Sequence, residues 1–422
     1  MQKRSLMLFK DLNRYTKKET EMEDREDSRP AERKRKQKHR STRRSSEKKY
    51  TWKHQLCKLP FLLLLVLGLL IPTFMKNADA AGVERIYSGK IYPVIAKILS
   101  APSSFVNFSI AEIAVVVLTV LFVLIFIIRL CKLAFGKLRK RHINRVRFFS
   151  FLISLGIFAG IMLNLFYCFW GFNNYRVKLA DSLQLDVRPR SVDELAYACE
   201  DLADRAAALR TIVTTDENGI YTIGEYKEAF EKVKEAYENL GSRNQLFNIP
   251  VHKAKPVFAS KALSKMGIAG IYTAYTAEMN VNVDQPDLYI LADAAHETAH
   301  YMGFAREDEA NFLAFYVSFF SDDANFRYSA AMHALANCSV KLYEQDSGRY
   351  YDLCEKHFTD GMKKDLDEYR EYFNQIRDDP VKTVSDKVND AYLKHNGQTD
   401  GIKSYGNMID LILAYYALMR VA

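Results

Sequence analysis

Cysteine is scarce in this sequence, and its cysteines form no metal-binding pattern. Only 6 of the 422 residues are cysteine, and no two have the close spacing of a zinc finger or ribbon. Three of them lie at or near long apolar runs, which leaves an odd number elsewhere: Cys199, Cys338 and Cys354. An odd number excludes a fully paired disulfide framework. One bridge, such as Cys338 with Cys354, remains open, but free buried thiols are the default expectation.

A basic surface for nucleic acid is also missing outside the N-terminal tail. Residues 1–58 hold 20 Lys/Arg and 9 Asp/Glu, a net charge of +11, whereas the whole chain carries +9. The remainder therefore has a net charge of −2, and the basic run at 33–44 contains no aromatic residue that could stack on bases. We expect no nucleic-acid partner. The tail is expected to be a disordered, solvated flank that contacts anionic lipid, with docking to a cytoplasmic partner as the alternative.

Charge is absent from the centres of three long apolar runs, residues 59–75, 109–128 and 148–170. The first is about the shortest length that can cross a bilayer, and the other two are long enough. Glu112 lies near one end of the second run, where the membrane interface can solvate its carboxylate. The sequence therefore predicts a membrane module over 59–171 with three transmembrane helices, and membrane lipids as partners.

The basic residues predict how this module is oriented. The tail at 1–58 and the loop at 129–147 are both strongly basic and belong in the cytoplasm by the positive-inside rule. Three crossings then place everything after residue 171 outside the cytoplasm. We expect a multi-pass protein of the cell membrane with a cytoplasmic N-terminus and an extracytoplasmic C-terminal domain. Ala78-Asp79-Ala80 resembles a signal-peptidase site, whose cleavage would leave two spans, but the long leader before it argues against cleavage.

The stretch with the clearest chemistry is His296-Glu297-Thr298-Ala299-His300. Residues 287–300 have helical periodicity, and Gly303 follows where a helix commonly ends. Residues four apart lie on one face of a helix, so His296 and His300 can hold one zinc ion, with Glu297 as the general base for a zinc-bound water. Zinc lowers the pKa of such a water to about 7. The pattern predicts one catalytic Zn²⁺ per chain. The alternatives are a solvated surface helix and a purely structural metal site.

The third zinc ligand is expected on a second helix that begins near Arg306. A catalytic zinc site has three protein ligands and one open position, and Glu307 and Glu309 are the early carboxylates of this helix. At about 100° per residue, Glu307 shares a face with Asn311, whereas Glu309 points about 200° away from Glu307. We therefore predict Glu307 as the ligand and keep Glu309 as the alternative metal ligand. Asn311 could accept a hydrogen bond from the ring of a ligating histidine.

Capping boxes and helical periodicity predict a mainly helical domain after residue 171. Ser191-x-x-Glu194 and Thr222-x-x-Glu225 match the capping-box pattern. The segments 270–276 and 279–283 alternate as strands do and predict a hairpin or a pair of strands. The expected fold class is an α-helical transmembrane anchor plus a mainly helical α+β domain with a small sheet. The helices are expected near 192–210, 223–239, 306–321, 327–345, 360–377 and 404–420.

Attack on a carbonyl also requires a group that stabilises the developing negative charge. The candidate transition-state stabilisers are Tyr275, Tyr301 and Arg306, with Tyr272 and His333 as further candidates. Because the chain holds 25 Tyr, ordinary packing is the alternative interpretation for any one of the tyrosines.

The motif and several other blocks resemble a known family. HETAHYMGFAREDEANFLAF at 296–315 resembles the core motif of the domain-of-unknown-function 3810 family of bacterial membrane proteins. The segments 170–176 (WGFNNYR), 267–282 (GIAGIYTAYTAEMNVN) and 396–406, with NGQTDG and SYG, also resemble that family's blocks. Together these resemblances cover most of the chain after residue 60, and they imply the cytoplasmic membrane of a bacterium as the location.

More distantly, HExxH followed by Glu-x-x-x-Asn is similar to the gluzincin metallopeptidases. This resemblance implies a zincin-like domain over 172–422, in which Glu307 is the third ligand and Asn311 supports a ligating histidine. It also implies that a strand before the motif binds extended peptide by edge pairing. Only six residues separate His300 from Glu307, fewer than in most gluzincins, and this short link leaves the choice between Glu307 and Glu309 open.

The sequence thus predicts a membrane-anchored, zinc-dependent metallohydrolase that acts on a peptide or protein substrate in the cell envelope. Peptide bonds are favoured over other amides or esters only by the resemblance to zincins. The alternative is a metal-binding membrane sensor or scaffold without hydrolytic activity. The presence of Glu297 argues against that alternative, because a structural zinc site needs no base.

Overall fold

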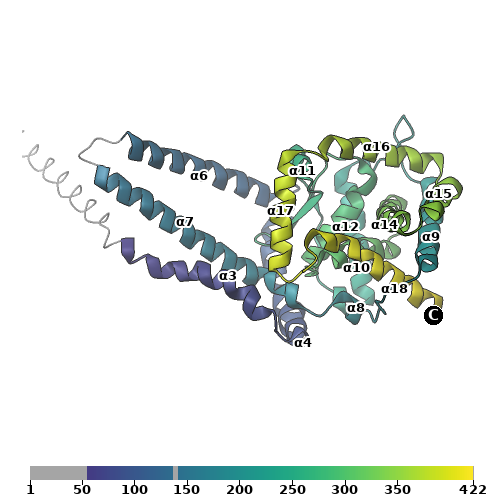
Figure 1. Ribbon diagram of the computed structural model, residues 1–422, viewed down its shortest axis with the longest axis horizontal. Coiled ribbons are helices and arrows are strands. Elements are labelled where there is room, and N and C mark those ends of the chain that lie inside the picture. The colour runs from purple at the N-terminus through teal and green to yellow at the C-terminus, as the bar shows by residue number, and fades with distance from the viewer. Residues whose placement is uncertain (1–54, 136–140, 422) are drawn as a thin grey trace, which may run out of the picture. The chain divides into compact units, whose positions relative to one another are not determined.

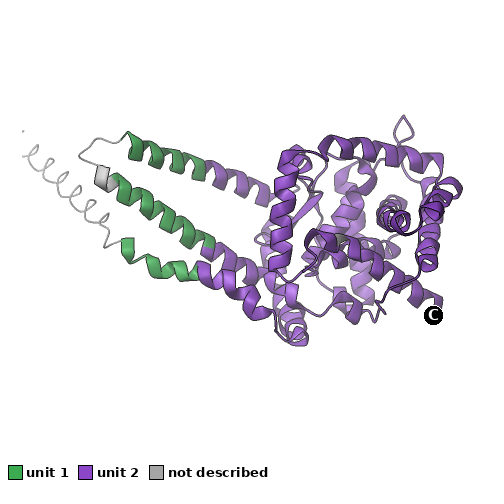
Figure 2. Cartoon of the chain, viewed as in Figure 1, with its two compact units in different colours: residues 1–64, 122–159 green, residues 65–121, 160–422 purple. Residues whose placement is uncertain are grey.

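The computed structural model describes residues 55–135 and 141–421 (Figure 1). Almost all of the basic tail and the middle of the basic loop predicted from the sequence therefore lie outside the described residues. The chain divides into two units (Figure 2): a smaller one of residues 1–64 and 122–159, and a larger one of residues 65–121 and 160–422.

Two helices among the described residues are long and apolar enough to cross a membrane. They are α6 (Ile110–Ala134) and the 144–169 part of α7 (Arg141–Phe169). Most apolar side chains of α6 are exposed, as expected of a helix that faces lipid rather than a protein core. The spans predicted at 109–128 and 148–170 are confirmed as candidate membrane-spanning helices.

The first predicted span is not a candidate span by itself. It comprises the 3₁₀ turn η1 (Leu59–Leu62) and the helix α3 (Leu63–Met75), which are long enough to cross a membrane only together with residues 80–104, across a bend of 114°. The part after the bend consists of α4 (Ala80–Gly82), the π-helix η2 (Val83–Ile91) and α5 (Tyr92–Ser104). The described residues therefore hold two candidate spans, or three if the bent pair counts as one.

Phenylalanines pack the smaller unit. The rings of Phe122 and Phe151 stack with their centroids 6.1 Å apart, and Phe126 lies against Phe148 at 6.3 Å. The Lys58 ammonium donates to the Ser150 hydroxyl at 3.0 Å. The ring contacts join α6 to α7 over the part of each helix that belongs to this unit, and the Lys58 hydrogen bond joins the segment before η1 to α7.

The larger unit is mainly helical. Capping explains the start of its first long helix, because Ser191 and Glu194 form the reciprocal box that the sequence predicts. The second predicted box is wrong: the helix begins at Tyr226, and the Thr222 hydroxyl donates to Asp287 at 2.7 Å instead of capping. The helices are η4 (Gly171–Tyr175), α8 (Leu179–Ser182), α9 (Val192–Arg210), α10 (Tyr226–Arg243), η5 (Gln245–Phe247), α11 (Ser260–Met266), η6 (Asp287–Tyr289), α12 (Ile290–Tyr301), α13 (Glu307–Tyr316), η7 (Val317–Phe320), α14 (Ala324–Gln345), α15 (Ser347–Lys356), α16 (Asp360–Ile376), α17 (Pro380–His395), η8 (Gly401–Asn407) and α18 (Met408–Val421).

A small three-stranded sheet lies beside the motif helix α12. Its strands are β1 (Lys255–Pro256), β2 (Gly270–Thr273) and β3 (Glu278–Val281), in the order β1-β3-β2. β2 and β3 form the antiparallel pair that the sequence predicts, with Ile271 opposite Asn280, while β1 runs parallel to β3. β2 is therefore an edge strand, and both β2 and β3 pack on α12.

Buried hydrogen bonds join the membrane-proximal segments to the end of the motif helix. The hydroxyl of Tyr92 on α5 donates to the Tyr301 carbonyl at 2.6 Å, and the indole N–H of Trp170 donates to the His300 carbonyl at 2.8 Å. Arg176 donates to the Gly303 carbonyl at 3.1 Å and forms an ion pair with Glu84 at 2.6 Å. Tyr92, Trp170 and Arg176, the last paired with Glu84, thus help to fix the end of the motif helix and the turn that follows it.

All six cysteines are free. The bridge between Cys338 and Cys354 that the sequence left open is not formed. Cys199 and Cys338 are buried, in agreement with the default expectation of free buried thiols.

Candidate metal centre

The two motif histidines lie on one face of α12, one turn apart, because their spacing of four residues matches the helical repeat. Their ring centroids are 4.6 Å apart and the rings are perpendicular. His300 is buried, and His296 is nearly so. The pair therefore presents two imidazole nitrogens toward a common point.

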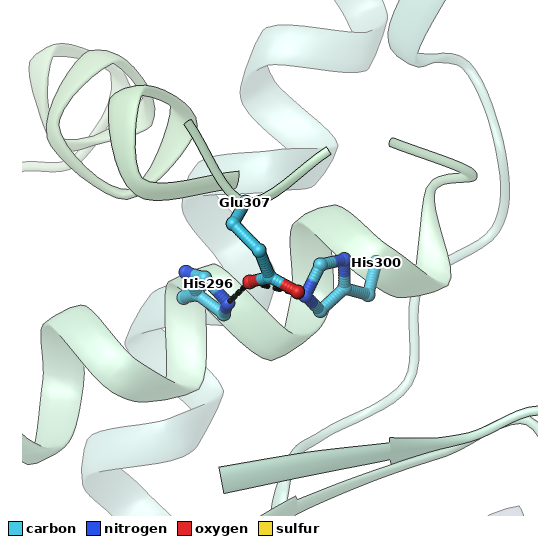
Figure 3. A group of neighbouring side chains, drawn as sticks. All are labelled: His296, His300 and Glu307. Atoms are coloured by element: carbon cyan, nitrogen blue, oxygen red, sulfur yellow. Dashed lines mark ion pairs between the residues drawn. The ribbon is translucent and has the colours of Figure 1, made fainter. Parts of the chain in front are cut away.

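Glu307, in the first turn of α13, supplies a carboxylate at the same point (Figure 3). Its Oε2 atom lies 3.2 Å from Nε2 of His296 and 3.5 Å from Nε2 of His300. One ligand atom of each of the three residues lies within 4.8 Å of those of the other two. A single ion can therefore contact all three.

A tight turn brings α13 back over α12. Gly303 has a φ of +86°, a conformation that residues with a side chain rarely adopt. An added Cβ would also lie 3.1 Å from the ring of Tyr92 and 3.2 Å from the side-chain oxygen of Asn173. The turn thus needs glycine both for its conformation and for the close approach of its neighbours.

The other ring nitrogens of the histidines are held by acceptors. Nδ1 of His296 lies 2.8 Å from the side-chain oxygen of Asn311, and Nδ1 of His300 lies 2.7 Å from the Phe304 carbonyl. Because a carbonyl oxygen only accepts, each Nδ1 must be the donor, which leaves the lone pair of a neutral ring on Nε2. This is the tautomer required for metal binding through Nε2.

Glu297 lies between the sheet and the histidines. It is buried, and its Oε2 atom has no hydrogen-bond partner among the described residues. A Cβ added to Gly270 of β2 would lie 2.5 Å from Glu297 Oε1, so the strand passes close to this carboxylate only because residue 270 has no side chain. Burial raises the pKa of Glu297 above its ordinary value.

The charges of the three clustered residues are coupled. Burial alone would raise the pKa of Glu307, but His300 and His296 beside it bring this pKa well below its usual range. Burial alone would lower the pKa of His300, but Glu307 raises it to about 9. A proton on His300 thus compensates the buried carboxylate when no ion is bound, and a divalent cation would take its place.

The donor set fits zinc. Two imidazole nitrogens and one carboxylate oxygen are the three protein ligands of a common catalytic zinc site, which keeps a fourth position for water. Asn311 and the Phe304 carbonyl hold the rings as supporting groups do in such sites. Glu297 is a buried carboxylate beside this set, with one oxygen free of hydrogen bonds among the described residues, and a carboxylate of this kind can act as a general base.

Glu309 is engaged elsewhere. Its Oε1 atom accepts hydrogen bonds from the Leu179 amide at 2.8 Å and from the Arg306 guanidinium at 3.0 Å. The structure therefore brings Glu307, and not Glu309, to the histidines.

The three predicted transition-state stabilisers are also bonded elsewhere. The Tyr301 hydroxyl donates to the Pro250 carbonyl at 2.7 Å, and Arg306 donates to the Arg176 carbonyl at 3.1 Å and to Glu309. Neither of these residues lines the cavity at the motif. Tyr275 does line it, but its hydroxyl donates to the Met162 carbonyl at 3.0 Å.

A cavity of about 2920 Å³ opens on the cluster and contains groups that the sequence did not single out. Asp293, one turn before His296 on α12, is bonded to Gln285 at 2.8 Å, and burial raises its pKa to about 7. Asp293 lies three residues before His296, on the same face of the helix, and this spacing could have identified it from the sequence. Tyr392 of α17 is so close to Glu307 that the carboxylate adds to the rise in pKa that burial causes. No local pattern marks that residue.

His333 of α14 was only a secondary candidate, and it lines the same cavity. Burial lowers its pKa to about 4, so the ring is neutral at physiological pH. Its Nδ1 atom has no hydrogen-bond partner among the described residues. His333 is therefore a neutral polar group near the cluster, and its Nδ1 atom forms no hydrogen bond with the other described residues.

One family model matches the chain. It is described as a protein of unknown function (DUF3810) and matches residues 87–413, which include the cluster and the cavity around it. No curated protein and no solved structure matches the chain.

Proposed function

We propose that this chain, which belongs to the DUF3810 family, is a membrane-associated, zinc-dependent metallohydrolase that acts as a peptidase. The observation that carries the proposal is the convergence of His296, His300 and Glu307 within 4.8 Å beside the buried carboxylate of Glu297. The likeness to gluzincins and a zincin-like fold are part of this proposal.

The protein's own residues divide the chemistry between them. His296, His300 and Glu307 would hold one Zn²⁺, which lowers the pKa of a bound water to about 7. Glu297 would take the proton from that water, and its raised pKa suits it to pass the proton on to the leaving group. The exclusion of bulk water by burial strengthens each of these charge interactions.

The edge strand β2 supports a peptide as substrate. Gly270 to Thr273 line the cavity, and the side of β2 away from β3 has no strand partner in the sheet. An extended peptide could pair with this edge by main-chain hydrogen bonds. Because Gly270 lies against Glu297, a peptide on this edge would pass close to the base.

His333 is the group that we favour for stabilising the negative charge on the attacked carbonyl oxygen, in place of Tyr275, Tyr301 and Arg306. It lines the cavity as a neutral imidazole, and a neutral ring can donate a hydrogen bond without repelling the metal. The polar groups of the other three are already hydrogen-bonded to main-chain carbonyls.

The test is hydrolysis of a quenched peptide library by the full-length protein in detergent or lipid nanodiscs, with and without a chelator. The full chain is needed because Tyr92 contacts the end of the motif helix and Glu84 pairs with Arg176, which contacts the turn that follows. We expect cleavage that the chelator removes and zinc restores. Stoichiometric zinc without cleavage of any peptide, amide or ester would instead favour the metal-binding sensor or scaffold.

A further inference from the structure

The cavity at the metal cluster extends to the membrane-spanning helices. Its walls include Val115 and Val116 in the second turn of α6 and Phe166 near the end of α7, together with the metal cluster itself. Both valines are more than half exposed and belong to the exposed apolar surface of α6, which would be the lipid-facing surface of this candidate span. The cavity and the lipid-facing surface are therefore continuous.

α17 provides a second apolar wall. Val381, Val384 and Val388 occur at i, i+3 and i+7, so they share one face of the helix, and all three line the cavity. They are 50%, 62% and 65% exposed, although burial of a valine is ordinarily favourable. The charged neighbours Lys382 and Asp386 pair with each other at 2.7 Å. The stripe thus offers an apolar surface to an occupant.

Hydrogen bonds fix the membrane end of α6 to the sheet that borders the cluster. Glu278 of β3 accepts from the amides of Ile110 and Ala111 at 3.0 and 2.8 Å, and it forms a buried ion pair with Lys255 at 2.7 Å. Glu112 accepts from the amides of Phe258 and Ala259 at 3.0 and 2.7 Å. These contacts lie within the larger unit, so the fold itself sets the distance between the start of the span and the cluster.

The rim between span and cavity is apolar as well. The Phe258 side chain is 79% exposed, and its neighbours Val257 and Ala259 line the cavity. Because the Glu112 carboxylate accepts a hydrogen bond from the amide of Phe258, the Phe258 ring lies close to the start of a candidate membrane span. An exposed aromatic side chain at that level is typical of the membrane interface.

We propose that the substrate enters from the membrane: the cavity takes the apolar segment of a membrane-embedded polypeptide between α6 and α17, and the adjoining extended segment reaches β2 and the metal cluster. The cutting step rests on the hydrolase function proposed above, whereas the binding step does not. Continuity of the cavity with the lipid-facing surface favours this occupant over a peptide that arrives from water.

Photo-crosslinking of the full-length protein in lipid nanodiscs tests the binding step. A Glu297→Gln background prevents cleavage, and benzoylphenylalanine replaces Val384, Val388 or, as a control, Ile212, which is 70% exposed but does not line the cavity. The probe is a synthetic peptide with a Leu/Ala transmembrane segment of about 20 residues and a water-soluble tail of mixed sequence. The tail alone and a fluorescent phospholipid are the comparison probes.

We expect positions 384 and 388 to capture the transmembrane probe about tenfold more than position 212 does, and about tenfold more than they capture the tail alone. Val384→Glu should reduce capture at position 388 about tenfold, because it places a charge in the apolar wall, while Ile212→Glu should not. Equal capture at 384 and 212, equal capture of the tail alone, or capture of the phospholipid only would each overturn the inference.

Cleavage by the parent protein separates this inference from the hydrolase function. Capture without cleavage of the transmembrane probe or of any library peptide would refute the hydrolase and support the route from the membrane. Cleavage of the tail alone, without capture at 384 or 388, would support the hydrolase and overturn the membrane route.

Discussion

Two carboxylates in the cluster have opposite electrostatic surroundings. Burial raises the pKa of Glu297, whereas the imidazoles beside Glu307 outweigh its burial and lower its pKa. Carboxylates whose pKa values are pushed apart commonly have different roles in one reaction. A permanently ionised Glu307 suits a metal ligand, and a Glu297 that can bind a proton suits a base.

The first prediction concerns zinc content. Replacing His296 or His300 with Ala should abolish tight zinc binding, because two remaining ligands are too few for a stable site. Elemental analysis of the purified full-length variants measures this. His357, whose ring faces Asp204 at 2.7 Å and lies outside the cavity, offers a matched control, since His357→Ala should retain one zinc per chain. Stoichiometric zinc in the double variant of His296 and His300 would exclude the assignment.

The second prediction separates metal binding from proton transfer. Glu297→Gln should keep zinc and the fold but lower the rate of hydrolysis roughly 10²–10⁴-fold, because Gln is nearly isosteric and cannot accept the proton of the water. The measurement is the cleavage rate of the best peptide from the library, with zinc content determined in the same samples. Activity within a few-fold of the parent would show that another group is the base.

The third prediction distinguishes the two early carboxylates of α13. Glu307→Ala should lose zinc, whereas Glu309→Ala should retain it but unfold at lower temperature, because the Leu179 amide and Arg306 lose their acceptor. Asn311→Ala should weaken zinc binding roughly 10–100-fold, because the His296 ring loses its orienting contact. Zinc titrations and thermal unfolding of the three variants measure both effects. Loss of zinc confined to Glu309→Ala would show that the wrong carboxylate has been chosen.

Local spacing was sufficient to find the residues of the cluster, because His296, Glu297 and His300 lie within two turns and Glu307 follows after a short link. Helical phase alone favoured Glu307 over Glu309, and the structure places these side chains accordingly. Tyr392 could not be found in this way, since it comes from a helix about 85 residues later and is brought in by tertiary packing. The metal and the reaction themselves stay predictions.

At the scale of elements, the contact of β2 with α12 is tight enough to test. Gly270→Ala should displace Glu297, because the new Cβ would lie 2.5 Å from Oε1 of that carboxylate. We expect hydrolysis to fall at least about tenfold while zinc, which Glu297 does not bind, is retained. The matched control is Gly406→Ala, whose Cβ would have no neighbour within 4 Å. Unchanged activity in Gly270→Ala would mean that Glu297 need not occupy its observed position.

Some elements with strong local signals were predicted well, but α15 and α17 were not among the predicted helices although Asp346 and Asp379 cap them, and elements that depend on distant partners were missed. The capping box at Ser191 correctly predicted where α9 begins, and helical periodicity correctly predicted where it ends. The second box failed because the Thr222 hydroxyl bonds to Asp287, 65 residues away. β1 was missed because a strand of two residues, Lys255–Pro256, has no pattern of its own and exists through pairing with β3. The bend of 114° after Met75 likewise has no signal in hydropathy.

At the scale of the whole molecule, the start of α6 and the end of α7 both belong to the larger unit (Figure 2), together with the metal cluster. If both helices cross the membrane, their connection around residue 140 lies on the opposite side from that unit. The basic residues of 129–147, which include the end of α6 and the start of α7, then decide which side is the cytoplasm, because positively charged segments between spans are retained there. The prediction is that the cluster lies outside the cytoplasm.

Reporter fusions to the full-length chain test this orientation in cells. An enzyme that is active only outside the cytoplasm should be active when fused after Ala422 and inactive when inserted near residue 140, and a reporter that is active only in the cytoplasm should give the reverse result.

The same two reporters also test the bent segment at 59–104. A single span there would place the N-terminus in the cytoplasm, on the same side of the membrane as residues 129–147, whereas a re-entrant segment would place it on the side of the cluster. A cytoplasmic reporter fused before Met1 should therefore be active only if the bent pair crosses the membrane. Activity of an extracytoplasmic reporter near residue 140 would instead place the metal cluster in the cytosol and exclude a substrate in the cell envelope.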